Sequence, residues 1–144
     1  MSERQIKKID LKNLSKDALS SLFQKNKNKI PNENIKSQIT SKALNNLDPQ
    51  VLFDFLKTHI NILTVNQIKK INVSSPDIAA ILIKEHHQNL SKNQIQKIDW
   101  SENSPINQVF KSNGDSLSTM NVLIKIRRFK DLTKEQFDNS INYE

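Results

Sequence analysis

Short segments that alternate apolar and polar residues at helical spacing recur along the chain. In the clearest of them, a Ser or Thr is followed three residues later by Gln. One isoleucine comes directly after this Gln, and a second comes three residues after the first. These copies are Leu63–Asn72, Leu90–Asp99 and Met1–Asp10, with weaker copies from Leu14, Ile39, Leu117 and Leu132. A hydroxyl at this place caps the first free amides of a helix, and the Gln can return to the amide of the capping residue. The pattern predicts short helices that start at these hydroxyls.

A second kind of helix alternates with the first. It begins with a capping residue and a proline, as in Asp48-Pro49, Ser75-Pro76 and Ser104-Pro105. Proline suits the first helical position because the amide that it lacks would have no partner there. Successive prolines are 27 and 29 residues apart, and the caps Thr40, Thr64, Ser91 and Ser118 follow one another at steps of 24, 27 and 27 residues. Two independent markers with one period indicate an internal repeat.

These patterns predict an all-α fold, a short-helix repeat array of eight or nine helices in one domain. Within residues 1–144 we expect N-terminal helices at 1–38, regular helix pairs at 39–114 and C-terminal helices at 115–144. The last region includes a longer predicted helix from about Thr119 to Lys130. With 35% hydrophobic residues and a single glycine, Gly114, the composition argues against a thick core or a turn-rich β-fold.

The charge and the hydropathy of the sequence limit the partners and the cellular location that we expect. The net charge is +7 and the pI about 9.6, which favours contact with phosphate or with acidic protein surfaces. No apolar run is long enough to span a bilayer and the first residues are charged, so we expect a soluble protein. Its location is expected to be the cytoplasm, or a host cytosol if the chain is a delivered effector. The chain has no cysteine, which excludes disulfides and thiolate chemistry.

Basic residues recur at matching places in the first kind of helix. They are Lys7, Lys8, Lys69, Lys70 and Lys97, and two arginines, Arg127 and Arg128, stand near the end of the chain. In a stack of repeats, matched positions fall on one face, where they form either an ordinary solvated surface or a track for phosphates. Trp100 follows one of these helices and is either a buried plug between repeats or an exposed anchor for a partner.

Catalytic constellations are not evident. His86 and His87 are adjacent and point about 100 degrees apart on a helix, so they do not chelate one ion as a pair four residues apart would. We interpret them as solvated residues near a helix end, where His is favourable. One glycine excludes a glycine-rich phosphate loop. The sequence therefore predicts neither an enzyme, nor a cofactor, nor a metal site.

Two resemblances bear on the repeat. The segments Leu63–Ile71 and Leu90–Ile98 resemble the first helix of TAL-effector-type DNA-binding repeats, which open Leu-Thr-x-x-Gln-Val-x-x-Ile. The Gly-Gly of that family is replaced here by Ser74-Ser75-Pro76-Asp77, and the period is shorter. The segment Leu47–Leu52 is similar to the helical superhelices of magnesium-transporter cytosolic domains and flagellar motor switch proteins. The first resemblance implies a helical array on DNA, and the second implies one that contacts proteins.

The expected function is that of a non-enzymatic interaction module for another macromolecule. A protein partner is the first hypothesis, with the chain as a small bacterial effector or accessory factor. The alternative is nucleic-acid binding by a basic helical surface. The candidate contacts are the same in both cases: Lys7, Lys8, Lys69, Lys70, Lys97, Trp100, Arg127 and Arg128.

Overall fold

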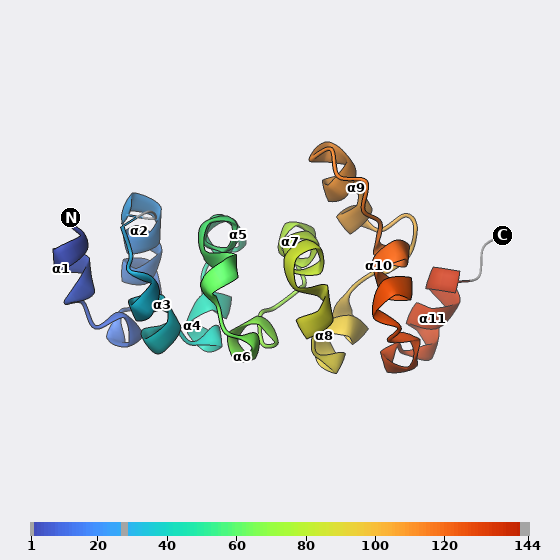
Figure 1. Cartoon of the computed structure of the whole chain (residues 1–144), viewed down its shortest axis with the longest axis horizontal. Coiled ribbons are helices and arrows are strands. Elements are labelled where there is room, and N and C mark those ends of the chain that lie inside the picture. The colour runs from blue at the N-terminus through green and yellow to red at the C-terminus, as the bar shows by residue number, and fades with distance from the viewer. Residues whose placement is uncertain (1, 27–28, 142–144) are drawn as a thin grey trace. The chain divides into compact units, whose positions relative to one another are not determined.

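The protein is helical throughout the part of the chain that the structure describes. The computed structural model describes residues 2–26 and 29–141, and its regular elements there are eleven α-helices and four short 3₁₀ helices (Figure 1). The chain divides into two compact units, unit 1 from Met1 to Ile71 and unit 2 from Asn72 to Glu144. Within the described ranges, no helix combines the length and the apolar character that crossing a membrane requires.

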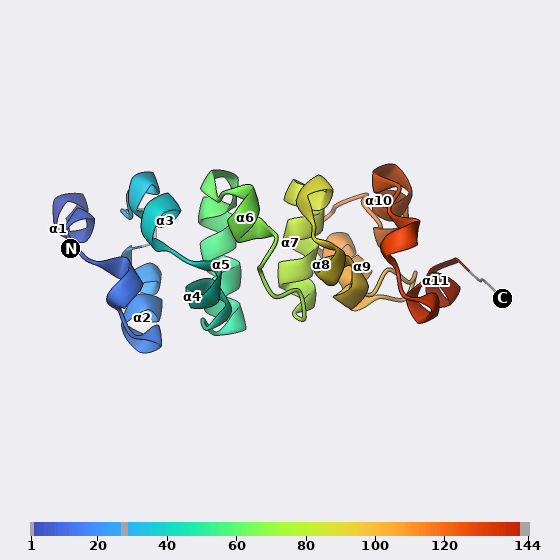
Figure 2. The same ribbon diagram turned by 90° about the horizontal axis from the view of Figure 1, so that it is seen from below.

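Unit 1 holds six α-helices and two 3₁₀ helices. In chain order they are α1 (Glu3–Lys7), η1 (Leu11–Asn13), α2 (Lys16–Asn26), α3 (Asn32–Gln38), α4 (Ser41–Asn45), α5 (Pro49–His59), η2 (Ile60–Ile62) and α6 (Val65–Ile68). Figure 2 shows α1, α3 and α6 in succession along one side of the unit. The predicted capping boxes are confirmed at Ser2 and Thr64, and Pro49 occupies the first turn of α5.

The core of unit 1 lies where α2 and α5 meet. The rings of Phe23 and Phe55 are 4.6 Å apart between their centroids, and the imidazole of His59 lies 5.0 Å beyond Phe55. Each shorter helix adds one deeply buried apolar side chain, such as Ile6, Ile35 or Ile68. A helix of four to seven residues does not persist in water by itself, so these contacts hold the short helices in place.

Unit 2 holds five α-helices and two 3₁₀ helices. They are α7 (Pro76–His86), η3 (His87–Asn89), α8 (Lys92–Lys97), α9 (Pro105–Ser112), α10 (Thr119–Ile126), η4 (Phe129–Asp131) and α11 (Lys134–Ile141). The closest packing is between α7 and α9. α9 is followed by Gly114, whose φ is +72°, and the amide of Asp115 donates to the carbonyl of Phe110. This is a left-handed helix stop that glycine adopts without strain.

Three features of the sequence-based prediction need correction or comparison. The predicted count of eight or nine helices is wrong, because the described residues form eleven α-helices. The predicted helix from Thr119 to Lys130 ends at Ile126, where Arg127 adopts a left-handed φ of 55° and a 3₁₀ turn follows. The boundary between the two units, at residue 71, coincides with neither of the sequence-based boundaries at residues 38 and 114.

Candidate functional site

Side-chain amides tie α1, α3 and α6 of unit 1 to one another. The Nδ2 of Asn34 donates to the carbonyl of Lys7 at 3.2 Å, which joins α3 to the end of α1. The Nε2 of Gln67 donates to the carbonyls of Ile35 at 3.3 Å and Ile39 at 2.6 Å, which joins α6 to the end of α3. We call each such contact an amide bridge. Backbone carbonyls at helix ends, such as those of Lys7 and Ile39, lack partners within their own helix, so the bridges satisfy them and fix the neighbouring helix. The carbonyl of Ile35 also accepts from the amide of Ile39.

The bridging glutamine has two functions at once. The Oε1 of Gln67 accepts from the amide of Thr64 at 2.8 Å, which closes the capping box, while its Nε2 reaches the previous helix. Gln136 does the same in unit 2: its Oε1 accepts from Thr133, and its Nε2 donates to the carbonyls of Ile95 and Ile98. The sequence predicted the capping function and did not predict the bridging one.

The bridges bring three lysines to equivalent positions on three neighbouring helices. Lys7, Lys36 and Lys69 each stand five residues after the capping residue of their helix, at Ser2, Pro31 and Thr64. We call these three lysines the lysine row. Lys36 was missed in the sequence because its helix is capped by Pro31 and lacks the hydroxyl signature. The lysine spacing from the cap was the signal that could have found it.

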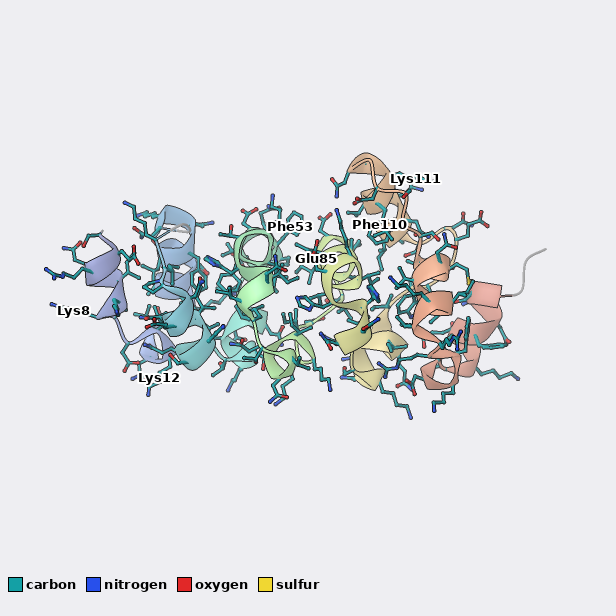
Figure 3. All side chains as sticks on the ribbon, viewed as in Figure 1. Lys8, Lys12, Phe53, Glu85, Phe110 and Lys111 are labelled. Atoms are coloured by element: carbon teal, nitrogen blue, oxygen red, sulfur yellow. The ribbon has the colours of Figure 1, made fainter. Side chains whose placement is uncertain are left out.

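The lysine row is exposed, and it is free to bind. Lys7, Lys36 and Lys69 all face solvent, and none of them takes part in an ion pair within the described residues. Lys8 and Lys70, next to the first and last of them, are exposed as well. Figure 3 shows Lys8 and, from η1, Lys12 extending from the ribbon of unit 1. Unit 1 therefore presents several cations that no carboxylate neutralises.

The net charge of the protein belongs entirely to unit 1. Residues 1–71 include 13 Lys and Arg against 6 Asp and Glu, a net charge of +7, whereas residues 72–144 include 9 of each. At the position of the lysine row, the bridged helices α8 and α11 of unit 2 have Gln96 and Asp138. Unit 2 shares the amide bridge and lacks the basic row.

The three basic candidates in unit 2 have different surroundings. Lys97 is exposed at the end of α8, and Arg127 is exposed at the end of α10. Arg128 is half-buried: its Nε donates to Asp131 at 2.6 Å and its Nη1 donates to the carbonyl of Leu90 at 2.5 Å. Arg128 thus holds η4 against the start of α8, and its contact with a partner stays a prediction.

Trp100 is a core residue. Only 1% of it is exposed, and its Nε1 donates to the carbonyl of Ile95 at 2.9 Å. Its own carbonyl accepts from the hydroxyl of Thr119, and the amide of Thr119 donates to the side chain of Asn107. The hypothesis of an exposed aromatic anchor is therefore wrong, and the alternative of a buried plug is confirmed.

The histidines have structural partners close by. The Nδ1 of His87 lies 3.1 Å from the carbonyl of Ile83, and the Nδ1 of His86 lies 3.4 Å from the Nδ2 of Asn89. Within residues 2–26 and 29–141, no group of three or more His, Asp or Glu side chains is arranged to hold a metal ion.

In comparisons with known proteins, no protein-family model, no curated protein and no solved structure matches the chain.

Proposed function

We propose that the chain is a non-enzymatic helical repeat module, and that unit 1 binds the phosphate backbone of nucleic acid through the lysine row. The observation that carries the proposal is the placement of Lys7, Lys36 and Lys69 at one position of three bridged helices. Under the same proposal, unit 2 is neutral and is built by the same rule without the cations.

The repeat part of the proposal is supported by the bridges and their spacing in sequence. The amide of Asn34 or Gln67 joins a helix to the one that precedes it in the row, and Gln136 does so in unit 2. A contact that recurs at one position of a motif stacks each unit only on its neighbours, which is how repeat proteins are built. The period of the prolines and caps agrees with this arrangement.

The nucleic-acid part is supported by spacing and charge. Helices that pack together are about 8–10 Å apart, which is the rise of two or three nucleotides at about 3.4 Å each along one strand. We therefore expect equivalent lysines on helices packed at this distance to be spaced like phosphates a few nucleotides apart. Unpaired lysines need not break an ion pair in order to bind, so their full attraction is available to a polyanion.

Aromatic side chains do not contribute to this surface. The rings of Phe23 and Phe55 are buried in unit 1, and Phe53 is half-buried with the ammonium of Lys57 4.8 Å from its centroid. Stacking on bases needs exposed rings along the track. We therefore propose backbone binding without base reading, to duplex DNA or RNA.

The first hypothesis from the sequence, a protein partner, remains the second candidate. Phe137 is 43% exposed and lies edge-on to Phe129, with ring centroids 6.5 Å apart. This aromatic pair on α11 and η4 is one apolar surface that a protein would contact, and it belongs to unit 2; Val65 of unit 1 and Ile124 of unit 2 are exposed as well. The lysine row and the aromatic pair lie in different units, so variants of the two separate these candidate surfaces.

The test is fluorescence anisotropy of labelled duplex DNA and duplex RNA, titrated with the full chain at about 50 and 200 mM salt. Binding should weaken steeply between these concentrations. The triple variant Lys7→Gln, Lys36→Gln, Lys69→Gln should reduce the slope of log K against log salt by about three, because each lost phosphate contact removes about one.

The matched control is Lys92→Gln, Lys111→Gln, Lys125→Gln in unit 2. These lysines are exposed and take part in no ion pair in the described part of the chain, and their loss changes the net charge by the same amount. If both triple variants weaken binding equally, only the total charge matters and the lysine row is not the site. If the unmodified chain binds neither duplex at the lower salt, the proposal fails and Phe137→Ala becomes the variant for protein capture.

A further inference from the structure

Unit 2 contains a hollow between the end of α8 and one face of α11. Its volume is about 210 Å³, and it is lined on one side by residues 96–100 and on the other by Glu135, Gln136, Asn139 and Ser140. Trp100 forms part of its wall. A pocket that encloses a drug-sized ligand has roughly 300–1,000 Å³, so this hollow has room for one functional group.

One polar group in the hollow lacks a partner. The Oγ of Ser140 is buried, with 1% of the residue exposed, and it has no hydrogen-bond partner in the structure. It is the one buried side-chain oxygen or nitrogen among the described residues of which this is true. A buried hydroxyl without a partner costs about 1–3 kcal/mol. Ser140 is among the residues that line the hollow, so a ligand there can supply the partner that the protein does not.

The neighbouring polar groups are satisfied by the protein itself or lie at the rim. The amide of Gln136 is engaged at both ends, by Thr133 and by the carbonyls of α8. One carboxylate oxygen of Asp99 accepts from the amide and hydroxyl of Ser101 at 3.0 and 2.6 Å. Glu135 and Asn139 are exposed, and neither carries a hydrogen bond or ion pair to the described residues. Their oxygens are therefore available as acceptors.

The charge of the lining favours a cation. Two carboxylates, Asp99 and Glu135, face one ammonium, that of Lys97, and the hollow adjoins the carboxyl-terminal end of α8, where the aligned peptide dipoles add partial negative charge. Lys97 is exposed and flexible, so it can turn to solvent when another cation enters. The same excess of negative charge in the lining would repel an anion.

We propose that this hollow in unit 2 binds a guanidinium or primary ammonium group, with Ser140 and Asn139 as hydrogen-bond acceptors and Glu135 as the counter-charge. The group comes either from a small amine or from the side chain of a basic peptide, and both share the chemistry that the site recognises. The site is separate from the lysine row, which attracts groups of the opposite charge.

Trp100 makes the site testable without a label, because it is the only tryptophan of the chain and lines the hollow. The full chain is titrated with agmatine, which carries a guanidinium and an ammonium group, and Trp100 fluorescence is recorded. A saturable change is expected, and a titration with acetate at the same ionic strength should give none. A tighter response to the tripeptide Gly-Arg-Gly than to agmatine would assign the cation to a peptide, and the reverse would assign it to a small amine.

Two variants distinguish a ligand site from a feature of the fold. Glu135→Gln should weaken agmatine binding about tenfold, whereas Glu102→Gln, an exposed carboxylate of the same unit outside the hollow, should leave it unchanged. Ser140→Ala should weaken binding as well, yet leave the unfolding midpoint equal or higher, because it removes a buried hydroxyl that the free protein does not satisfy. Opposite effects on affinity and stability are not expected of a purely structural serine.

Two results would overturn the proposal. The first is a fluorescence response to agmatine that does not saturate, which would leave the hollow a solvent pocket whose water satisfies Ser140. The second is an equal loss of binding in Glu135→Gln and Glu102→Gln, which would show general screening of the unit instead of a site.

Discussion

Units 1 and 2 use one structural rule for two different surfaces. Both begin short helices with a hydroxyl cap and join helices by an amide that reaches back to earlier carbonyls, at Gln67 in unit 1 and Gln136 in unit 2. At the position two residues after that amide, unit 1 has Lys69 and unit 2 has Asp138. The amide bridge is thus the same in both units, whereas the exposed residue two positions after it is basic in unit 1 and acidic in unit 2.

The units also differ in how they use their polar groups. Among the described residues, the ion pairs of unit 2, Lys84 with Asp115 at 3.0 Å and Arg128 with Asp131 at 2.6 Å, are shorter than those of unit 1, Lys16 with Asp48 and Lys57 with Asp54, both at 3.6 Å. A buried network in unit 2 also joins Trp100, Thr119 and Asn107. In unit 1, the lysine row is unpaired within the described residues. The comparison teaches that the lysine row is held by no ion pair among the described residues, whereas Lys84 and Arg128 of unit 2 are engaged by neighbouring carboxylates.

The largest expected effect comes from removing the tryptophan side chain from the core of unit 2. Trp100→Ala removes a side chain that is 1% exposed together with its hydrogen bond to Ile95, so we expect a loss of about 3–5 kcal/mol in the free energy of unfolding. Hydrogen exchange followed by mass spectrometry should show faster exchange in peptides from residues 72–141. Equal acceleration in peptides of unit 1 would show that the two units unfold together.

Two glutamines test the amide bridge. Gln5 and Gln67 each belong to a capping box of their own, and Gln67 also forms a bridge. Gln67→Met loses the box and two bonds to α3, so we expect about 2–3 kcal/mol of destabilisation. Gln5 is exposed and has only the capping bonds, so Gln5→Met should cost about 1 kcal/mol. Chemical denaturation followed by circular dichroism gives both values, and equal losses would mean that the bridge contributes nothing.

A smaller effect, of the opposite sign, is expected at Arg127. Its φ of 55° is a left-handed conformation that costs a residue with a side chain about 1–2 kcal/mol, and glycine avoids this cost. Arg127→Gly should therefore stabilise unit 2 by about 1 kcal/mol. Thermal unfolding measures the change, and destabilisation would show that the side chain of Arg127 makes contacts that matter to the fold.

The smallest expected effect is a pH dependence in unit 2. The hydrogen bond and charge of Asp115 raise the pKa of Lys84 above its ordinary value. A raised lysine pKa stabilises the folded state at pH values below the ordinary pKa of about 10.4, and this contribution is lost as pH rises through the raised value. Asp115→Asn should remove this dependence, measured as the unfolding midpoint from neutral to alkaline pH. A dependence that persists in the variant would have another origin.

Much of the local structure could be read from the sequence. Hydroxyl caps and prolines at the first helical position are short-range chemistry, and the helices start where Thr64, Ser91 and Pro76 predict. The helix ends were harder. No local sequence pattern predicts that α10 ends before Arg127. The end of this helix depends on the hydrogen bond from Arg128 to the carbonyl of Leu90, a residue 38 positions away.

The candidate sites were less accessible from the sequence for the same reason. The matching lysines Lys7 and Lys69 were predicted, but Lys36 between them became visible only when Asn34 and Gln67 were seen to join the three helices. Trp100 had two interpretations, and only the packing of the chain decides between them. The hollow at Ser140 joins segments 35 or more residues apart, so no local pattern indicates it.

The confinement of the net charge of +7 to residues 1–71 has a kinetic consequence. If unit 1 binds a polyanion as proposed, electrostatic steering toward its cations raises the association rate by 10-fold to about 1,000-fold at low ionic strength, whereas the neutral unit 2 contributes nothing to this acceleration.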